Sequence, residues 1–259
     1  MTSKKPFDLL VVPDDEPPVL SGTLYEPRAR TLASEVAWYF DRPLNTAATI
    51  ERIRHADAII NIRSSVIFDR EVLSRCTKLK ILSIWGTGVD HVDLAAASEF
   101  GIIVSNTPGY GAPYVSEHAL TLALSISRQI VQNDRHMREG GWTRGFIDEL
   151  YGKTLGVIGT GAIGQRMIQL GKAIGMNVVA WTLHPTSERG LAYGVDFITL
   201  GQLLSESDVV SIHVALSNET EKLIGAQQLH LMKRNAILVN TARGGVLDQD
   251  ALFECLIEN

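Results

Sequence analysis

A glycine-rich turn between an apolar run and a helical pattern is the clearest chemical signal in the sequence. The turn reads Gly159-Thr160-Gly161-Ala162-Ile163-Gly164 and follows Leu155–Ile158. In this spacing the first glycine permits a tight turn, the second lets the backbone approach a pyrophosphate, and the third lets the helix pack closely on the strand. The free N–H groups at the start of the helix then face the anion. The motif and its strand–turn–helix context predict a dinucleotide site.

The residues after the next expected strand bear on which dinucleotide binds. In sites of this kind an acidic residue about twenty positions after the glycine turn bonds the adenosine ribose hydroxyls. Here Thr182 occupies that position, and His184 and Arg189 follow it. A threonine hydroxyl can bond a ribose without repelling a 2′-phosphate, so both NAD and NADP remain open. His184 and Arg189 are equally compatible with ordinary solvated loop residues.

Short apolar runs alternate with helical patterns along the chain, which predicts an α/β protein with mostly parallel sheets. The expected strands are Leu9–Val12, Ala58–Asn61, Leu79–Ile84, Ile102–Ser105, Leu155–Ile158, Val178–Thr182, Val195–Ile198, Val209–Val214 and Ala236–Asn240. The expected helices are Thr46–Arg54, Asp69–Cys76, Leu94–Glu99, Ala162–Ile174, Leu200–Ser205 and a segment from Asp248 onward.

One longer helix is expected between the two series of strands. The segment Tyr114–His136 contains no Gly or Pro and follows a loop rich in both. Its length corresponds to about six turns. We expect it to join two domains or to form a subunit contact.

Composition excludes several classes of protein. The 259 residues include 24 Lys and Arg against 29 Asp and Glu, and this acidic balance argues against binding to nucleic acid or to an anionic membrane. No apolar run approaches the roughly 18 residues of a membrane span, and Leu9–Val12 is too short for a signal peptide. Cys76 and Cys255 lie far apart without metal-ligand spacing, so no metal site is expected. We expect a cytoplasmic protein with one large or two modest domains.

Several segments, in order along nearly the whole chain, resemble the D-isomer-specific 2-hydroxyacid dehydrogenases. The matching segments are residues 62–65, 86–93, 106–109, 115–118, 141–142, 152–159, 210–214 and 239–245. The resemblance implies hydride transfer between NAD or NADP and a small 2-oxo or D-2-hydroxy acid. It also implies two doubly wound domains, a flavodoxin-like substrate domain at residues 1–105 and a Rossmann domain at 106–259. A homodimer joined through the long helix is implied as well.

The resemblance also assigns roles to individual residues. Arg243 corresponds to the catalytic arginine, whose guanidinium fork would grip a carboxylate and polarise the adjacent carbonyl. The additional cofactor-binding positions are Thr182, His213, Thr241 and Ala242. The substrate positions are Arg63, Ser64, Gly86, Thr87 and Gly88, the last three forming a turn whose N–H groups would bind the carboxylate. A solvated Arg63, and a simple glycine turn before a helix, remain compatible with the same residues.

The sequence departs from the family pattern in three respects. Near His213, Ala215 stands where the family usually has Pro. Gly111 stands where many relatives carry an Asn near the substrate, which leaves the substrate unidentified. The family's proton-donating His and its Glu partner are expected after Arg243, where this sequence has no His. We therefore expect a Rossmann domain that is incomplete at its C-terminus and turnover that is impaired. A non-catalytic NAD(P)-binding sensor or scaffold is the alternative.

Overall fold

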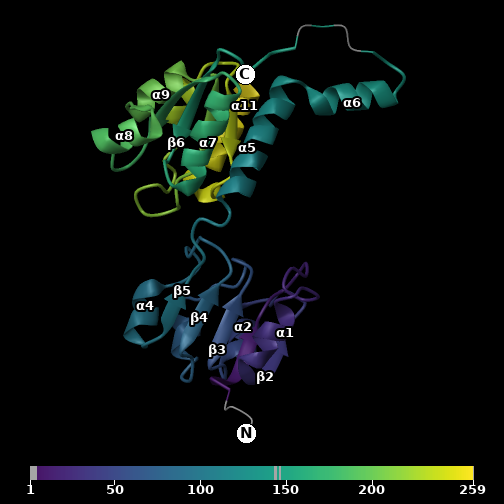
Figure 1. Ribbon diagram of the computed structural model, residues 1–259, viewed down its shortest axis with the longest axis vertical. Coiled ribbons are helices and arrows are strands. Elements are labelled where there is room, and N and C mark those ends of the chain that lie inside the picture. The colour runs from purple at the N-terminus through teal and green to yellow at the C-terminus, as the bar shows by residue number, and fades with distance from the viewer. Residues whose placement is uncertain (1–4, 143–144, 146, 259) are drawn as a thin grey trace. The chain divides into compact units, whose positions relative to one another are not determined.

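The computed structural model describes residues 5–142, 145 and 147–258, which form two compact units. Unit 1 comprises residues 1–110 and unit 2 comprises residues 111–259. Over the described residues each unit contains one parallel sheet of five strands, and Figure 1 shows the two sheets with their helices. The predicted α/β class with two doubly wound parallel sheets is confirmed.

Unit 1 has the strand order β2-β1-β3-β4-β5, which is the flavodoxin-like order. Its strands are β1 (Phe7–Val12), β2 (Ala33–Trp38), β3 (Ala58–Asn61), β4 (Ile81–Ile84) and β5 (Ile103–Ser105). Its helices are α1 (Glu26–Thr31), α2 (Thr46–Ile53), α3 (Arg70–Ser74) and α4 (Leu94–Glu99).

Local capping fixes where three helices of unit 1 begin. The side chains of Asn45, Asp69 and Asp93 each accept a hydrogen bond from the backbone N–H three residues further on. Helices α2, α3 and α4 then bury apolar residues against one sheet face, including Ile53, Leu73 and Ala96. On the other face, α1 and the loop before it pack over β1 and β2.

Unit 2 has the order β10-β9-β6-β7-β8, the arrangement of dinucleotide-binding sheets. Its strands are β6 (Thr154–Ile158), β7 (Asn177–Trp181), β8 (Asp196–Phe197), β9 (Val209–Ile212) and β10 (Ile237–Asn240). Its helices are α5 (Ala112–Ser127), α6 (Ile130–Arg138), α7 (Ala162–Ala173), α8 (Ser187–Tyr193), α9 (Leu200–Glu206), α10 (Ala226–Leu231) and α11 (Gln249–Glu258), with a 3₁₀ turn at Gly244–Val246.

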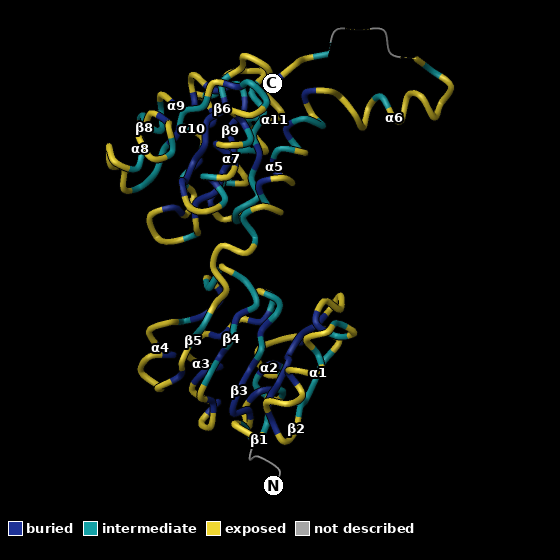
Figure 2. Tube along the Cα trace, viewed as in Figure 1, coloured by how far each residue is buried: buried dark blue, intermediate teal, exposed yellow. Residues whose placement is uncertain are grey.

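The sheet of unit 2 is covered on both faces. Helices α5 and α7 pack on one face over Leu155 and Val157 of β6, and α7 buries Met167 there. Helices α9, α10 and α11 belong to a second apolar cluster around Leu203 and Val210. Figure 2 shows the strands of this sheet buried between these layers. Such double burial explains why β6 and β9 read as continuous apolar runs in the sequence.

The single helix predicted over Tyr114–His136 is not what the chain forms. Residues 112–138 form two helices, α5 and α6, separated at Arg128 and Gln129. Gln129 has φ = +51°, in the left-handed region, which an L-residue within an α-helix cannot adopt. Helix α5 packs within unit 2 on α7 and β10, whereas α6 projects from it and buries no residue (Figures 1 and 2).

Candidate functional site

Four parallel strands of unit 2 end in one row across the sheet. The residues paired across neighbouring strands are Trp181, Ile158, Ile212 and Asn240. The residues that directly follow them are predicted cofactor-binding residues, namely Thr182, Gly159, His213 and Thr241. The strand order reverses between β6 and β9, and open α/β sheets bind ligands in the crevice at such a reversal. Gly159 and His213 lie at this point.

Each glycine of the turn after β6 meets a different structural demand. Gly159 has φ = +94°, and a Cβ atom there would lie 2.7 Å from Val214 Cγ1. A Cβ atom on Gly164 would collide with the carbonyl oxygen of Gly159, so glycine alone lets α7 pack this closely on the turn. A Cβ atom on Gly161 would meet no described atom within 4 Å. The backbone at Gly161 therefore borders open space, which is where a pyrophosphate must approach.

The start of α7 provides hydrogen-bond donors at this space. Gly161 is the N-cap and has no side chain with which to cap the helix. Ala162, Ile163 and Gly164 form the first turn, whose N–H groups have no acceptor within the helix. Thr160 is buried beside them, at 1% exposure. The turn and the helix start thus fit the pyrophosphate of NAD or NADP, through backbone donors and the positive end of the helix dipole.

His213 is a buried imidazole at the end of β9. Its backbone N–H donates to the Ile158 carbonyl oxygen at 2.7 Å, and its Nε2 lies 2.8 Å from Ser211 Oγ. Burial lowers the pKa of His213 to about 4. Within the part of the chain that the structure describes, its Nδ1 has no hydrogen-bond partner. At neutral pH the ring is uncharged and can bond a polar ligand atom.

Arg243 is held in a turn that Asn240 stabilises. Asn240 Nδ2 donates to the Arg243 carbonyl oxygen at 2.9 Å, and Asn240 Oδ1 accepts from the Ala242 N–H at 3.0 Å. Arg243 Nη1 in turn donates to the Ala242 carbonyl oxygen at 3.1 Å. The Thr241 hydroxyl is buried and, among the described residues, unpartnered. The three predicted residues 241–243 thus lie together at the sheet edge that carries Gly159 and His213.

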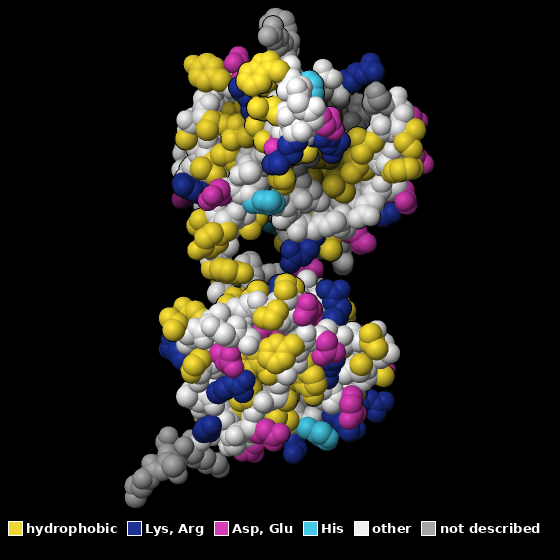
Figure 3. All heavy atoms as spheres, turned by 90° about the vertical axis from the view of Figure 1, so that its right-hand side faces the viewer, with side chains coloured by type: hydrophobic (Ala, Val, Ile, Leu, Met, Phe, Trp, Pro, Cys, Tyr) yellow, Lys and Arg dark blue, Asp and Glu magenta, His cyan; other side chains and the backbone are white. Residues whose placement is uncertain are grey.

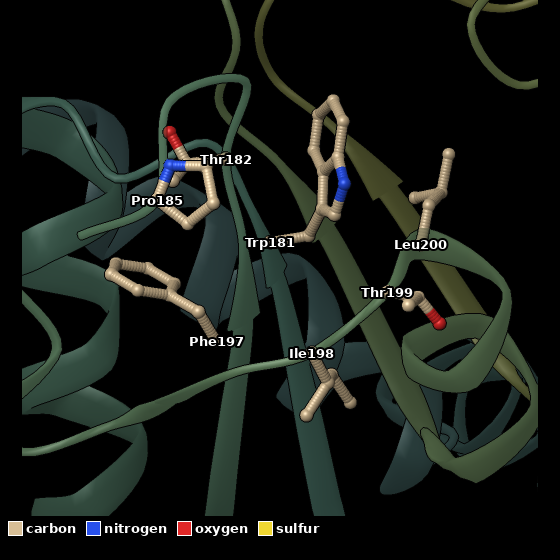
Figure 4. Close-up of a pocket in the computed structure, with 7 residues that line it drawn as sticks. All are labelled: Trp181, Thr182, Pro185, Phe197, Ile198, Thr199 and Leu200. Carbon is tan, nitrogen blue, oxygen red and sulfur yellow. The ribbon is translucent and has the colours of Figure 1, made fainter. Parts of the chain in front are cut away.

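A cavity of about 360 Å³ lies beyond the end of β7. Its lining residues, drawn in Figure 4, are Trp181, Thr182, Pro185, Phe197, Ile198, Thr199 and Leu200. Thr182 and Pro185 lie together, whereas the Trp181 ring points the opposite way (Figure 4). Thr182 and Thr199 both bring a hydroxyl to this cavity, and of the two Thr182 is the one that follows β7.

A side-chain network that the sequence did not reveal joins α8 to the glycine turn. Arg189 Nη2 donates to Thr160 Oγ1 at 2.8 Å. Gln165 Nε2 donates to the Thr160 carbonyl oxygen at 3.1 Å and to the Tyr193 hydroxyl at 2.9 Å. Gln165 and Tyr193 were not predicted as site residues. Arg189 was noted in the sequence because the acidic residue after β7 is missing, but its contact with Thr160 was not predicted.

The predicted substrate residues lie at one sheet edge of unit 1. Asn61 and Ile84, which end β3 and β4, are paired, and Arg63 and Gly86 each follow two residues later. Arg63 Nη2 donates to the Pro17 carbonyl oxygen, and Ser64 is exposed. The Arg63 Nε is buried and has no partner among the described residues. The guanidinium is therefore anchored on one side and has an unsatisfied donor.

The turn Gly86-Thr87-Gly88 is tied down through its carbonyl groups. The Thr107 N–H donates to the Gly86 carbonyl oxygen at 2.8 Å, and Asn106 Nδ2 donates to the Thr87 carbonyl oxygen at 2.8 Å. Thr87 Oγ1 donates to the Thr107 carbonyl oxygen at 3.1 Å. The predicted segment 106–109 thus fixes the turn that follows β4.

Two buried acids at the same edge were not predicted as site residues. Asp14 accepts a hydrogen bond from Ser65 Oγ at 2.7 Å. Burial would raise the pKa of Asp15, but N–H donors from Val19, Ser21 and Leu20, and the Trp38 indole, hold it below its usual value. Asp15 thus serves to order the loop after β1, while Asp14 contacts the residues that follow β3.

The described residues contain neither a membrane-spanning helix nor a cluster of metal ligands. No helix among residues 5–142 or 147–258 has the length and apolar character needed to cross a bilayer. In the same ranges no three His, Cys, Asp or Glu side chains gather in a way that could hold a metal ion.

Comparison with known proteins shows what the chain is similar to. Residues 120–259 match the family model described as D-isomer specific 2-hydroxyacid dehydrogenase, NAD binding domain. The glyoxylate reductase of Korarchaeum cryptofilum is 37% identical, over 85% of this chain and 68% of its own length. The D-3-phosphoglycerate dehydrogenase of Methanocaldococcus jannaschii is 40% identical over 81% of this chain. The chain spans only 40% of that enzyme's length.

Solved structures give the same result. The D-lactate dehydrogenase of Aquifex aeolicus, complexed with NAD and lactic acid, has a TM-score of 0.85 and 29% identity. That match covers 97% of this chain and 74% of the other. An acyclic imino acid reductase in complex with NADPH and D-Arg also has a TM-score of 0.85, with 27% identity over 96% of this chain and 79% of the other. The cofactor of this chain is NAD or NADP, and the chain belongs to the D-isomer-specific 2-hydroxyacid dehydrogenase family.

Proposed function

We propose that the protein transfers hydride between NAD or NADP and a small 2-oxo or D-2-hydroxy acid. The observation that carries the proposal is the row of strand ends in unit 2. It gathers the open glycine turn, the neutral His213 and the turn that presents Arg243 at one sheet edge. Reduced nicotinamide, when bound, supplies the hydride. The chain's own residues supply binding, orientation and charge.

Arg243 is proposed to bind the acid. Its guanidinium can form two parallel hydrogen bonds with a carboxylate, and its positive charge stabilises negative charge that develops on the neighbouring carbonyl oxygen. Lysine, as a point charge, cannot reproduce the paired geometry. The two hydrogen bonds of the Asn240 side chain restrain the backbone at Ala242 and Arg243, so the Arg243 guanidinium extends from a restrained backbone position.

In unit 1, Arg63, Ser64 and the turn Gly86-Thr87-Gly88 are proposed to recognise the substrate. The turn contributes backbone N–H donors, and Arg63 contributes a positive charge with a buried, unsatisfied Nε. Both follow paired strand ends, so the sheet of unit 1 fixes their spacing.

His213 is not proposed as the proton donor. A group whose pKa is about 4 carries a proton in only a small fraction of molecules at neutral pH, so it is a poor general acid there. We assign His213 to cofactor binding. The impaired turnover expected from the sequence stays a prediction.

We further propose a homodimer that forms through α5 and α6. Ile130, Val131 and Met137 are more than half exposed, and α6 has no buried residue. Figure 3 faces the side from which α6 projects and shows hydrophobic side chains at the surface of unit 2. A nine-residue helix without packing is marginal in water. A second copy would offer the same apolar side chains in a symmetric contact.

The proposed reaction is tested by measuring cofactor binding and hydride transfer on the same preparation. Binding is followed by the fluorescence of NADH and NADPH, and transfer by nicotinamide absorbance with glyoxylate, pyruvate or hydroxypyruvate. Arg243→Lys should reduce kcat/KM roughly 100-fold. Where turnover is too slow to measure, the variant should abolish the binding of oxamate, an unreactive analogue of a 2-oxo acid. Arg234→Lys, an exposed arginine before β10, is the matched control. Cofactor binding without oxamate binding in the unmodified chain would favour the non-catalytic alternative.

A further inference from the structure

The corner between the glycine turn and the end of β7 lacks the carboxylate that sites of this fold usually carry, and the nearby Arg189 donates a hydrogen bond to the turn. β7 ends at Trp181 and continues as Thr182, Leu183 and His184, without an acid. The usual acid bonds the ribose 2′-hydroxyl and would repel a phosphate attached there. Its replacement by a neutral hydroxyl removes this repulsion.

Arg189 is fixed at this corner by three hydrogen bonds. Its Nη2 donates to Thr160 Oγ1 at 2.8 Å, and its Nη1 donates to the His184 carbonyl oxygen at 2.7 Å. Its backbone N–H donates to Thr186 Oγ1 at 3.2 Å, which caps α8. The guanidinium therefore spans from the loop after β7 to the loop after β6, and both ends of the side chain are restrained.

The charge of Arg189 is not neutralised by a carboxylate. Both guanidinium acceptors are neutral oxygens, and among the described residues Arg189 forms no ion pair within 4.0 Å. The nearest acid in sequence, Glu188, is exposed on the same helix. A guanidinium carries five N–H donors, so donors remain for a ligand. A restrained arginine with spare donors is the side chain that most often pairs with phosphate.

The position of Thr160 relates this charge to the dinucleotide. Thr160 stands between Gly159, which makes the turn, and Gly161, where the backbone is open to a pyrophosphate. Thr182 follows Trp181, which pairs with Ile158 immediately before that turn. A ribose that reached from a pyrophosphate at Gly161 toward Thr182 would therefore begin beside Thr160, whose hydroxyl binds Arg189.

We propose that Arg189, supported by Thr160, binds the 2′-phosphate of NADP(H), so that this chain selects NADP(H) over NAD(H). The inference rests on the dinucleotide site of the proposed function. Charge-assisted hydrogen bonds to one phosphate should make NADPH bind about 10- to 100-fold more tightly than NADH. The preference should weaken as salt rises, because the subsite is only partly buried.

The experiment uses two probes that lack nicotinamide. The affinities of 2′,5′-ADP and 5′-AMP are measured by calorimetry on the 259-residue chain, beside fluorescence titrations with NADPH and NADH. We expect 2′,5′-ADP to bind at least tenfold more tightly than 5′-AMP. Arg189→Gln should remove this difference by weakening 2′,5′-ADP while leaving 5′-AMP within twofold. Arg234→Gln, which removes the same charge before β10, should leave both affinities unchanged.

A second variant, designed to reverse the cofactor preference, tests the proposal even if Arg189→Gln does not fold. Thr182→Asp restores a carboxylate at the end of β7, and we expect it to invert the preference toward 5′-AMP and NADH. Equal affinity of the unmodified chain for both probes would overturn the proposal. Equal weakening of both probes by Arg189→Gln would also overturn it, since the arginine would then support adenosine rather than phosphate. Failure of NADH and NADPH alike to bind would instead refute the dinucleotide site itself.

Discussion

A Cβ atom placed on Gly159 would lie 2.8 Å from the carbonyl carbon of His213. The turn after β6 and the loop after β9 thus touch through their backbones. The contact leaves no space for a side chain at Gly159. The adjacent Gly161 stands in the opposite situation, with open space around it. Substitutions at the two glycines should therefore have different effects, which experiment can distinguish.

Gly159→Ala should destabilise the protein, whereas Gly161→Ala should mainly weaken cofactor binding. The first substitution combines a positive φ with close backbone contacts and should lower the free energy of unfolding by at least about 2 kcal/mol. The second meets no described atom and should change stability by less than about 1 kcal/mol. It should nevertheless weaken NADPH binding at least roughly tenfold by blocking the approach of the pyrophosphate. Denaturant unfolding and fluorescence titration measure the two effects.

The buried His213 should make stability fall between about pH 6.5 and pH 4. Its folded-state pKa of about 4 lies below the unfolded value of 6.5, so in this window the unfolded chain binds a proton that the folded chain does not. Stability is therefore lost as the pH falls, by up to about 3 kcal/mol from this group. Unfolding free energies of the unmodified chain and of His213→Gln, compared at pH 7.5 and pH 5, should show a smaller pH dependence in the variant. An identical dependence would refute the assignment.

Asn240→Ala should weaken binding of the substrate acid more than binding of the cofactor. The Asn240 side chain makes two hydrogen bonds that shape the turn at Ala242 and Arg243, and their loss should cost about 1–2 kcal/mol of stability. If this turn positions Arg243, oxamate affinity should fall about tenfold while NADPH affinity changes less than twofold. Asn177→Ala is a suitable control, since Asn177 bonds the Gly152 carbonyl oxygen at the opposite end of a strand. Equal loss for both ligands would contradict a positioning role.

Charge introduced on α6 should dissociate the proposed dimer. Val131 is 62% exposed and Met137 is 55% exposed, so neither substitution disturbs packing within the chain. The double variant Val131→Glu, Met137→Glu should elute as a monomer in light-scattering chromatography, with unit 2 still able to bind NADPH. Leu191→Glu places a charge on another exposed apolar residue of unit 2 and should leave the dimer intact. A monomeric unmodified chain would refute the proposal directly.

Much of the fold could be predicted because the buried strands are apolar and the helix starts are marked by local caps. Ala58–Asn61 and Leu94–Glu99 have the same bounds in the prediction and in the structure. The edge strand β2 was missed because Ser34 and Glu35 interrupt its apolar pattern. Helix α8 was missed because Gly190 lies within it, and α10 because its first turn is polar. The break at Gln129 could not be predicted, since no Gly or Pro marks it.

In the candidate site, too, the features that depend on neighbouring residues could be predicted and the long-range contacts could not. The roles of Gly159, Gly161 and Gly164 could be read from the sequence, because each depends on its immediate neighbours. The contact between Arg189 and Thr160 joins residues 29 positions apart and depends on how α8 folds back toward β6. No local pattern contains that information. The sequence alone therefore left the choice between NAD and NADP open.

The aligned strand ends of unit 2 constrain how this family can change length. A residue inserted within β6, β7, β9 or β10 would displace one member of the row and turn the following side chains to the opposite face. A residue inserted beyond the row would lengthen only a loop. Natural insertions and deletions among relatives should therefore concentrate in the loops past Thr182, His213 and Arg243, where they alter ligand choice without disturbing the scaffold.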